Sequence, residues 1–91
     1  MSIDDTLKER GKVYGEFRDY ALIAGTLNRV IQNRIDDSNN DSLEWIHIEA
    51  LKMIVSKISR IISGDPNHVD NWHDIAGYAT LVENEIKKMD K

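Results

Sequence analysis

The sequence contains no cysteine among its 91 residues, so neither disulfides nor thiolate-based metal sites can stabilise the fold. A chain of this length buries only about 60% of the surface that its unfolded form exposes, which leaves a single copy with a small core. Oligomerisation is one way in which short chains compensate for a small core. We therefore expect the protein to assemble with further copies of itself as a homo-oligomer.

Long apolar runs are also missing. No stretch of about 18 apolar residues is present, so neither a membrane span nor a membrane partner is expected. The N-terminal segment MSIDDTLKERG is charged from its fourth residue and lacks the apolar core of a secretion signal. The 12 basic and 16 acidic residues give a net charge of −4, without the basic excess that nonspecific binding of DNA or RNA requires. These absences favour a cytoplasmic protein.

The first segment of the chain has the pattern of a short helix. Ser2 and Asp5 have the spacing of a capping box, which predicts a helix that runs to about Glu9 or Arg10. Gly11 is expected to end this helix, and residues 11–15 are expected to form a turn or loop.

Three longer helices follow from apolar residues that recur every three or four positions. They are expected over residues 16–34, over 43–63, and from about 69 or 71 to 88. The polar run 36–42 predicts a connector in which Asp41 or Ser42 caps the next helix. Gly64 and Pro66, the only proline, predict the second turn.

The helix over 43–63 has apolar residues on two roughly opposite sides, for example Trp45, Ile48 and Val55 on one and Ile46 and Ile54 on the other. A helix of this kind is usually covered on both sides, and we expect another subunit to cover the second. The sequence therefore predicts an all-α hairpin or small bundle of three to four helices, in a single domain spanning residues 1–91. Trp45 and Trp72 are expected to anchor the core or a subunit interface.

The segment RGKVYGEF (10–17) is a first candidate binding site. Its two glycines free the backbone to approach a ligand, Arg10 and Lys12 can bind phosphate, and Tyr14 can stack on a base. The alternative is a plain turn between helices, with Tyr14 and Phe17 as core anchors.

A second candidate is formed by Asp70 and Asp74, which are four residues apart and share a helix face. Asp74 lies near the core edge and needs a partner, for which Lys57 and Arg60 on the preceding helix are the candidates. Three interpretations are open: an ion-pair network between helices, an anion pocket in which Lys57 or Arg60 contacts phosphate, or a magnesium site.

The histidines raise a further possibility. His47 with the pair His73 and Asp74 and with Asp70 is similar to the ligand order of metal-dependent HD phosphohydrolases, although that fold needs a longer helical chain. The alternative is that Asp70 caps a helix while His68 and His73 lie near solvent.

Two longer motifs resemble known proteins. RGKVYGEF, together with KISRIISGDPNHVDNWHDIAGYATL, is similar to a family of small phage and prophage proteins of uncharacterised function, over about residues 9–82. This resemblance implies a helical, phage-associated protein that would act in the host cytoplasm, and it implies no defined activity.

EWIHIEALK and DNWHDIAGY show a looser resemblance to MazG-like all-α nucleoside triphosphate pyrophosphohydrolases, which hold magnesium with ExxE and ExxD motifs. The resemblance implies Glu49, Asp70 and Asp74 as the metal ligands. The sequence departs from the family because Glu44 and Glu49 are five residues apart, and the second element contains no glutamate.

Three functions are consistent with these patterns. The one we favour is noncatalytic binding, or sequestration, of a nucleotide or nucleotide-derived signal, as in phage counter-defence, without a cofactor. The others are a magnesium-dependent nucleotide pyrophosphohydrolase and a protein-interaction module that inhibits a host protein. The ligand-binding residues that we expect are Arg10, Lys12, Tyr14, Lys57, Arg60, Asp70, Asp74 and Tyr78.

Overall fold

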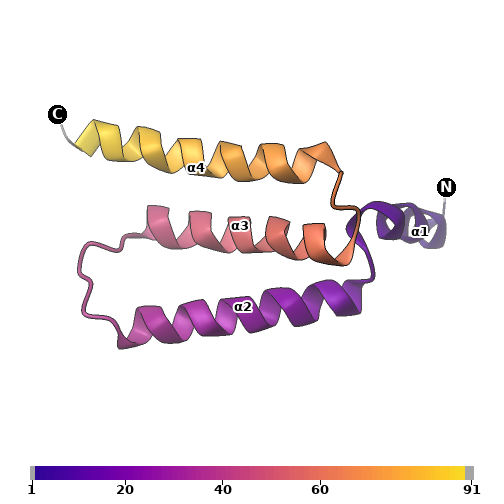
Figure 1. Cartoon of the computed structure of the whole chain (residues 1–91), viewed down its shortest axis with the longest axis horizontal. Coiled ribbons are helices and arrows are strands. Elements are labelled where there is room, and N and C mark those ends of the chain that lie inside the picture. Colours follow the sequence, from indigo (N-terminus) through magenta and orange to yellow (C-terminus); the bar gives the residue numbers. More distant parts are fainter. Residues whose placement is uncertain (1, 90–91) are drawn as a thin grey trace.

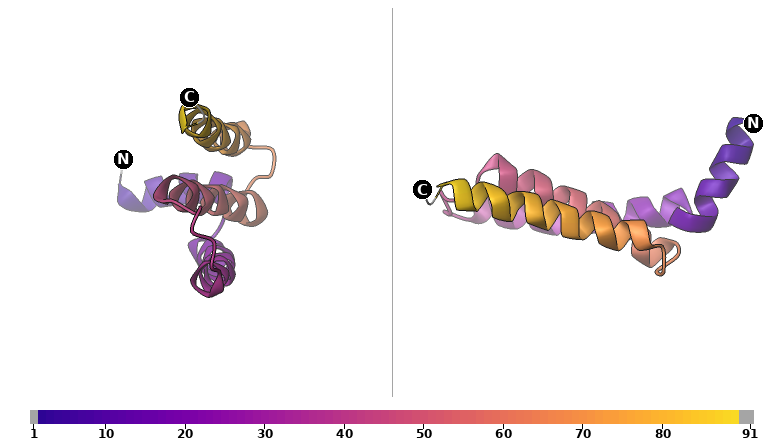
Figure 2. Two further views of the ribbon diagram at one scale, coloured as in Figure 1. Left: turned by 90° about the vertical axis from the view of Figure 1, so that its left-hand side faces the viewer. Right: turned by 90° about the horizontal axis from the view of Figure 1, so that it is seen from above.

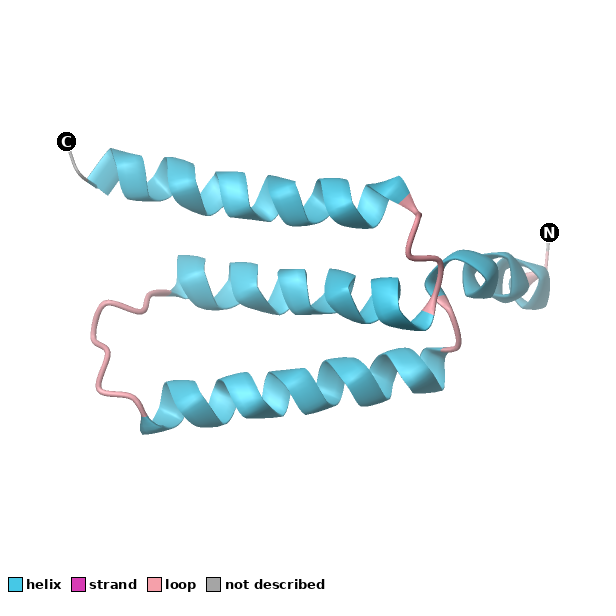
Figure 3. Cartoon of the chain, viewed as in Figure 1, coloured by secondary structure: helices cyan, strands magenta, loops and turns pink. Residues whose placement is uncertain are grey.

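The computed structural model describes residues 2–89 of the chain, which form four helices (Figure 1). The helices are α1 (Ile3–Tyr14), α2 (Phe17–Asp37), α3 (Trp45–Ser63) and α4 (Val69–Met89). No strand occurs in the described part of the chain, so the prediction of a small all-α protein is confirmed (Figure 3). None of the four helices is both long enough and apolar enough to cross a membrane.

The three long helices lie side by side in one antiparallel layer, with α3 in the middle (Figure 1). Helix α3 contacts both α2 and α4, whereas α2 and α4 do not contact each other within residues 2–89. Helix α1 leaves the layer at the end where α2 begins and α3 ends, and it projects to one face (Figure 2). The second apolar side of α3 is thus covered by α4 of the same chain, not by another subunit as the sequence had led us to expect.

A layer that is one helix thick buries few apolar side chains from solvent. Only Ala24, Ala50 and Val55 are buried apolar residues among those described. The radius of gyration is 15.8 Å, against about 12 Å expected for a compact chain of this length. Trp45 and Trp72 are 76% and 55% exposed, so neither anchors a core within one chain.

The first helix is longer than predicted. Ser2 is the N-cap, and its Oγ accepts a hydrogen bond from the backbone N–H of Asp5 at 3.2 Å. Gly11 does not end α1, however, and the helix continues to Tyr14. A glycine inside a helix lowers its stability by only about 1 kcal/mol, which tertiary contacts of the last turn can outweigh.

The connector between α2 and α3 also differs in detail from the prediction. Helix α2 continues to Asp37, and the connector occupies residues 38–44. Neither Asp41 nor Ser42 caps α3, because Glu44 is its N-cap residue. The backbone N–H of Glu44 donates to Nδ1 of His47 at 3.0 Å, so a histidine takes the role that glutamate or glutamine has in an ordinary capping box.

Candidate functional site

Two glycines bring the ends of α1 and α3 into direct backbone contact. Gly15, between α1 and α2, has a φ of 82°, a conformation that L-residues rarely adopt. A Cβ atom at Gly15 would collide with the carbonyl group of Ser63, and one at Gly64 would collide with the backbone of Val13 and Tyr14. The crossing is therefore possible only because both positions lack a side chain.

Hydrogen bonds hold this crossing together. The backbone N–H of Asp65 donates to the carbonyl oxygen of Val13 at 2.8 Å, and Oγ of Ser63 donates to the carbonyl oxygen of Tyr14 at 3.0 Å. The last turn of α1 is thus attached to the end of α3, which explains why α1 continues past Gly11.

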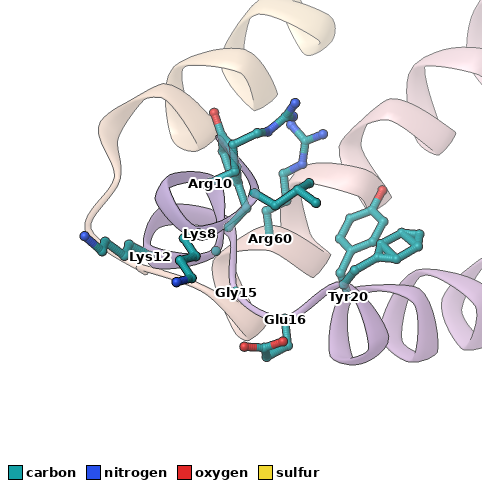
Figure 4. A pocket seen from close by; sticks show the side chains of 11 residues that line it. Lys8, Arg10, Lys12, Gly15, Glu16, Tyr20 and Arg60 are labelled. Carbon is teal, nitrogen blue, oxygen red and sulfur yellow. The ribbon is translucent and has the colours of Figure 1, made fainter. Parts of the chain in front are cut away.

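An open cavity of about 1020 Å³ lies beside the crossing, between α1, the start of α2 and the end of α3 (Figure 4). Its wall contains four cationic side chains, one carboxylate and three aromatic rings. The lining residues are Leu7, Lys8, Arg10, Gly11, Lys12, Tyr14, Gly15, Glu16, Phe17, Tyr20 and Arg60. This cationic cavity occurs in a protein whose net charge is −4.

Two arginines share one aromatic ring in this cavity. The guanidinium carbon of Arg60 lies 4.9 Å from the centroid of the Tyr14 ring, and that of Arg10 lies 5.5 Å from the same centroid. The two cations are therefore at most about 10 Å apart. Cation–π contacts orient a guanidinium without neutralising its charge, so its N–H groups keep their capacity to bind an anion.

The cations of the cavity are largely free of carboxylate partners. Within residues 2–89, Lys8, Arg10 and Arg60 form no ion pair, and only Lys12 pairs with a carboxylate, that of Glu9, at 3.0 Å. Glu16 is the single acidic residue in the wall. The cavity thus presents an excess of positive charge to a ligand.

Aromatic side chains form the opposite part of the wall. The rings of Phe17 and Tyr20 are nearly parallel, with centroids 6.1 Å apart and 20° between their planes. The hydroxyl of Tyr20 lies 2.9 Å from Oγ of Ser56 and forms a hydrogen bond that joins α2 to α3. Phe17 is 74% exposed, so an apolar, planar surface is open to a ligand. Phe17 is thus not a core anchor in a single chain.

The structure brings together four of the eight ligand-binding residues expected from the sequence. Arg10, Lys12, Tyr14 and Arg60 line the cationic cavity although Arg60 is far from the other three in sequence. Lys57 points instead toward α4, where its Nζ lies 2.9 Å from Oδ2 of Asp74. The interpretation of Asp74 as one half of an ion pair between helices thus matches the geometry.

The Lys57–Asp74 pair is unequal in its exposure. The side chain of Lys57 is 11% exposed and that of Asp74 is 42% exposed. The hydrogen bond from Lys57 lowers the pKa of the Asp74 carboxyl group below its ordinary value of 3.8, and the positive charge of Lys57 adds to this effect. Asp74 is therefore ionised at neutral pH and neutralises a largely buried cation.

The other expected residues lie elsewhere. Asp70 is in the first turn of α4, with Oδ2 3.6 Å from Nε2 of His68. Tyr78 lines a second, smaller cavity of about 210 Å³ between α3 and α4, together with Ile46, Met53 and Leu81. Lys57, Asp70, Asp74 and Tyr78 thus do not line the cationic cavity.

The carboxylates expected as metal ligands are also separated. Glu49 is paired with Lys52 at 3.8 Å, and Asp74 is paired with Lys57. No group of three histidine, aspartate or glutamate side chains in the described part of the chain is close enough to hold a metal ion. Among the histidines, His47 caps α3, and the ring of His68 lies nearly perpendicular to the Tyr14 ring, with centroids 5.7 Å apart.

Lys8, Phe17 and Tyr20 belong to the cavity wall but were not identified from the sequence as ligand-binding residues. The sequence did hold a signal, because Lys8 and Lys12 are four residues apart and share a face if the helix continues through Gly11. Because we expected Gly11 to end the helix, the sequence did not indicate that Lys8 and Lys12 lie on one helix face.

A family model matches residues 4–86 of the chain, and it is described as a domain of unknown function, DUF6378. No curated protein and no solved structure matches the chain significantly. The prediction that the chain resembles a family of uncharacterised function is thus confirmed.

Proposed function

The chain belongs to the DUF6378 family, and because this family has no described activity, we propose a function from the cavity itself. The protein is a noncatalytic binder of a nucleotide or nucleotide-derived signal. The observation on which this proposal depends is the composition of the cationic cavity, where four cations and three aromatic rings surround one open space.

The two chemical parts of a nucleotide correspond to two parts of the wall. Phosphate groups would lie between Arg10 and Arg60, where guanidinium groups without carboxylate partners can each donate two hydrogen bonds. The base would stack on Phe17 or Tyr20, because every base offers a flat π surface to an aromatic ring. A simple anion would use only the first part, and the exposed rings favour a ligand with an aromatic group.

Binding without catalysis is favoured by the position of the carboxylates. Magnesium-dependent pyrophosphohydrolysis needs several carboxylates around the phosphate chain. Here Asp74 is engaged by Lys57, Glu49 by Lys52, and neither lines the cationic cavity. The only carboxylate in the wall is that of Glu16.

Sequestration is the biological role that we propose for such a binder. The motifs RGKVYGEF and GDPNHVDNWHDIAGYATL resemble those of phage and prophage proteins. A phage protein that binds a nucleotide messenger tightly, without turnover, would lower its free concentration in the host cell and so weaken a defence that depends on it.

Titration calorimetry tests the binding. The panel should contain linear nucleotides, cyclic dinucleotides, inorganic pyrophosphate and a nucleoside, so that the contributions of phosphate and base are separated. We expect at least one nucleotide to bind more tightly than either pyrophosphate or the nucleoside alone. The ligand should be recovered chemically intact after incubation with magnesium.

Arg60→Gln is the sharpest variant, and Lys52→Gln is its matched control. Both remove one positive charge from α3, but Lys52 lies outside the cavity. Loss of charge-assisted hydrogen bonds should weaken binding by about tenfold or more in Arg60→Gln and leave Lys52→Gln unchanged. Absence of heat with every member of the panel, or equal weakening by both variants, would contradict the proposal.

A further inference from the structure

Helix α3 exposes apolar side chains on the face of the layer opposite to α1. Arg60 points toward α1, as its contact with the Tyr14 ring shows. Ile58 and Ile62 are each two residues from Arg60, so their side chains are rotated by about 200° from Arg60 around the axis of α3. Leu51 is nine residues from Arg60, which corresponds to a rotation of about 180° once full turns are removed. These three residues therefore point to the other face, where Leu51 and Ile62 are 41% and 64% exposed.

Helix α4 continues this apolar face. Leu81 lines the small cavity together with Met53. Met53 is seven residues, or almost two full turns, from Arg60, so Met53 and the neighbouring Leu81 lie on the same side of the layer as Arg60. Trp72 is nine residues and Ala79 two residues from Leu81, which places both on the opposite side. Trp72 is 55% exposed and Ala79 is also exposed.

We call this surface the open apolar face and define it by Leu51, Ile58, Ile62, Trp72, Ala79 and Ile86. Its charged residue on α4, Glu83, is already paired with Lys87 at 2.8 Å. Helix α1 lies on the other side of the layer and does not cover it (Figure 2).

We propose that the open apolar face binds the same face of a second copy of this chain. The solvent-accessible surface of one copy is 6998 Å², whereas a compact protein of this mass exposes about 5,400 Å². The excess of about 1,600 Å² is twice the 800 Å² per partner that a stable interface of standard size buries. One copy therefore has enough surplus surface for a full interface.

A second copy, rather than a different protein, is the occupant that the burial favours. The described residues of one chain fully bury only three apolar side chains, which is a small core for four helices. A partner that enlarges this core is most useful if it is present whenever the chain is made, and a second copy of the chain meets this condition. Face-to-face pairing of two layers would enclose these side chains between two sets of helices, and it would leave the cationic cavity accessible on the outer side.

Two single-tryptophan proteins test which face is buried. Trp45→Phe retains Trp72 on the open apolar face, whereas Trp72→Phe retains Trp45, which is 76% exposed. On going from dilute to concentrated protein, acrylamide quenching should fall severalfold for Trp72 and should stay unchanged for Trp45. Protection of Trp45 and not of Trp72 would overturn the proposal, since it would place the contact on another surface.

Sedimentation of the unmodified chain tests the assembly itself, and it needs no variant. We expect a species of at least two copies and an unfolding temperature that rises with protein concentration. A folded monomer at all concentrations up to about one hundred micromolar, far above the dissociation constant of an ordinary stable interface, would overturn the proposal.

A matched pair of charge insertions then locates the interface. Ala79→Glu places a carboxylate on the open apolar face, and Ala21→Glu places one on α2 at an exposed position four residues from Phe17, on the cavity side. Ala79→Glu should dissociate or unfold the assembly at concentrations where Ala21→Glu leaves it intact. Equal behaviour of the two variants would argue against this face.

Discussion

At the end of the layer where α1 meets the α3–α4 turn, hydrogen bonds join residues that are far apart in sequence. Tyr20 is bonded to Ser56, Ser63 to Tyr14, and Asp65 to Val13. At the opposite end, around the 38–44 connector and the last turns of α4, the side-chain hydrogen bonds link residues no more than four positions apart. The two ends are thus held by contacts of different range.

This difference explains where the cavity lies. A binding site needs side chains from several elements to keep a constant geometry, and only long-range contacts can provide this. The cavity is lined by side chains from α1, α2 and α3, among them Tyr14, Tyr20 and Arg60. Tyr14 and Tyr20 each take part in a long-range hydrogen bond, and the guanidinium group of Arg60 lies over both of their rings. Substitutions at the two ends should therefore have unequal effects, which the following experiments measure.

The largest effect is expected for Gly15→Ala. The new Cβ atom would have to coexist with the Ser63 carbonyl group at a positive φ, which should lower the free energy of unfolding by more than about 2 kcal/mol. Gly25→Ala is the control, because its Cβ would meet open space inside α2 and should raise stability by about 0.5 to 1 kcal/mol. Urea unfolding followed by circular dichroism measures both, and similar changes in the two variants would show that the crossing is not essential.

Asp74→Asn should have the next largest effect, since it leaves Lys57, only 11% exposed in its side chain, without a counter-charge. The lowered pKa of Asp74 also sets a pH dependence. The stabilisation from the ionised carboxylate is fully present above 3.8 and is lost as the pH falls through the lowered pKa. Thermal unfolding from pH 2 to 7 should therefore show a smaller acid loss in Asp74→Asn than in the unmodified chain; identical pH profiles would count against the pair.

Tyr20→Phe should have a moderate effect. It removes the hydrogen bond to Ser56 but retains the ring, so the loss of stability should be about 1 kcal/mol. Tyr78→Phe is a matched control on α4, where the hydroxyl forms no hydrogen bond with another described side chain, and its stability should be nearly unchanged. A larger loss in Tyr78→Phe than in Tyr20→Phe would reverse the comparison.

The smallest effect is expected at the far end. Lys88 is bonded to Glu85 at 2.9 Å, with side chains that are 71% and 46% exposed. Because water and salt screen such a pair, Lys88→Ala should change the free energy of unfolding by less than about 0.5 kcal/mol. A loss as large as that of Tyr20→Phe would mean that the far end is held more firmly than its local contacts indicate.

Much of the secondary structure could be predicted from local pattern. The apolar spacing gave the three long helices, and Gly64 with Pro66 gave the turn after α3. One error has a tertiary cause, because α1 passes through Gly11 while its last turn is bonded to the α3–α4 turn. The other error is local: Glu44 and His47, three residues apart, form the cap of α3 in place of Asp41 or Ser42, and histidine is not the residue found at this position of an ordinary capping box.

The candidate site divides in the same way. Arg10, Lys12 and Tyr14 were identified because they lie within one motif. Lys57 and Arg60 were both candidate partners of Asp74 because they precede the same turn, and the structure pairs Asp74 with Lys57. Arg60 belongs with the first group and Lys57 with the second, although the two residues are three positions apart on α3 and their directions differ by only about 60° around the helix axis. Both assignments were open in the sequence because the directions of α1 and α4 around α3 were unknown.

By itself, the sequence determined that this protein is helical, lacks cysteine chemistry, and places Arg10, Lys12 and Tyr14 close together in the RGKVYGEF motif. Helical periodicity and composition are local properties, and they need no knowledge of the partner helix. Only the tertiary structure decided that the helices form a single open layer and that Arg60 joins this motif around one cavity. The reason is steric, because the close backbone contact at Gly15 and Gly64 directs α1 to one face of α3. The local sequence pattern does not indicate which backbone segments come into contact.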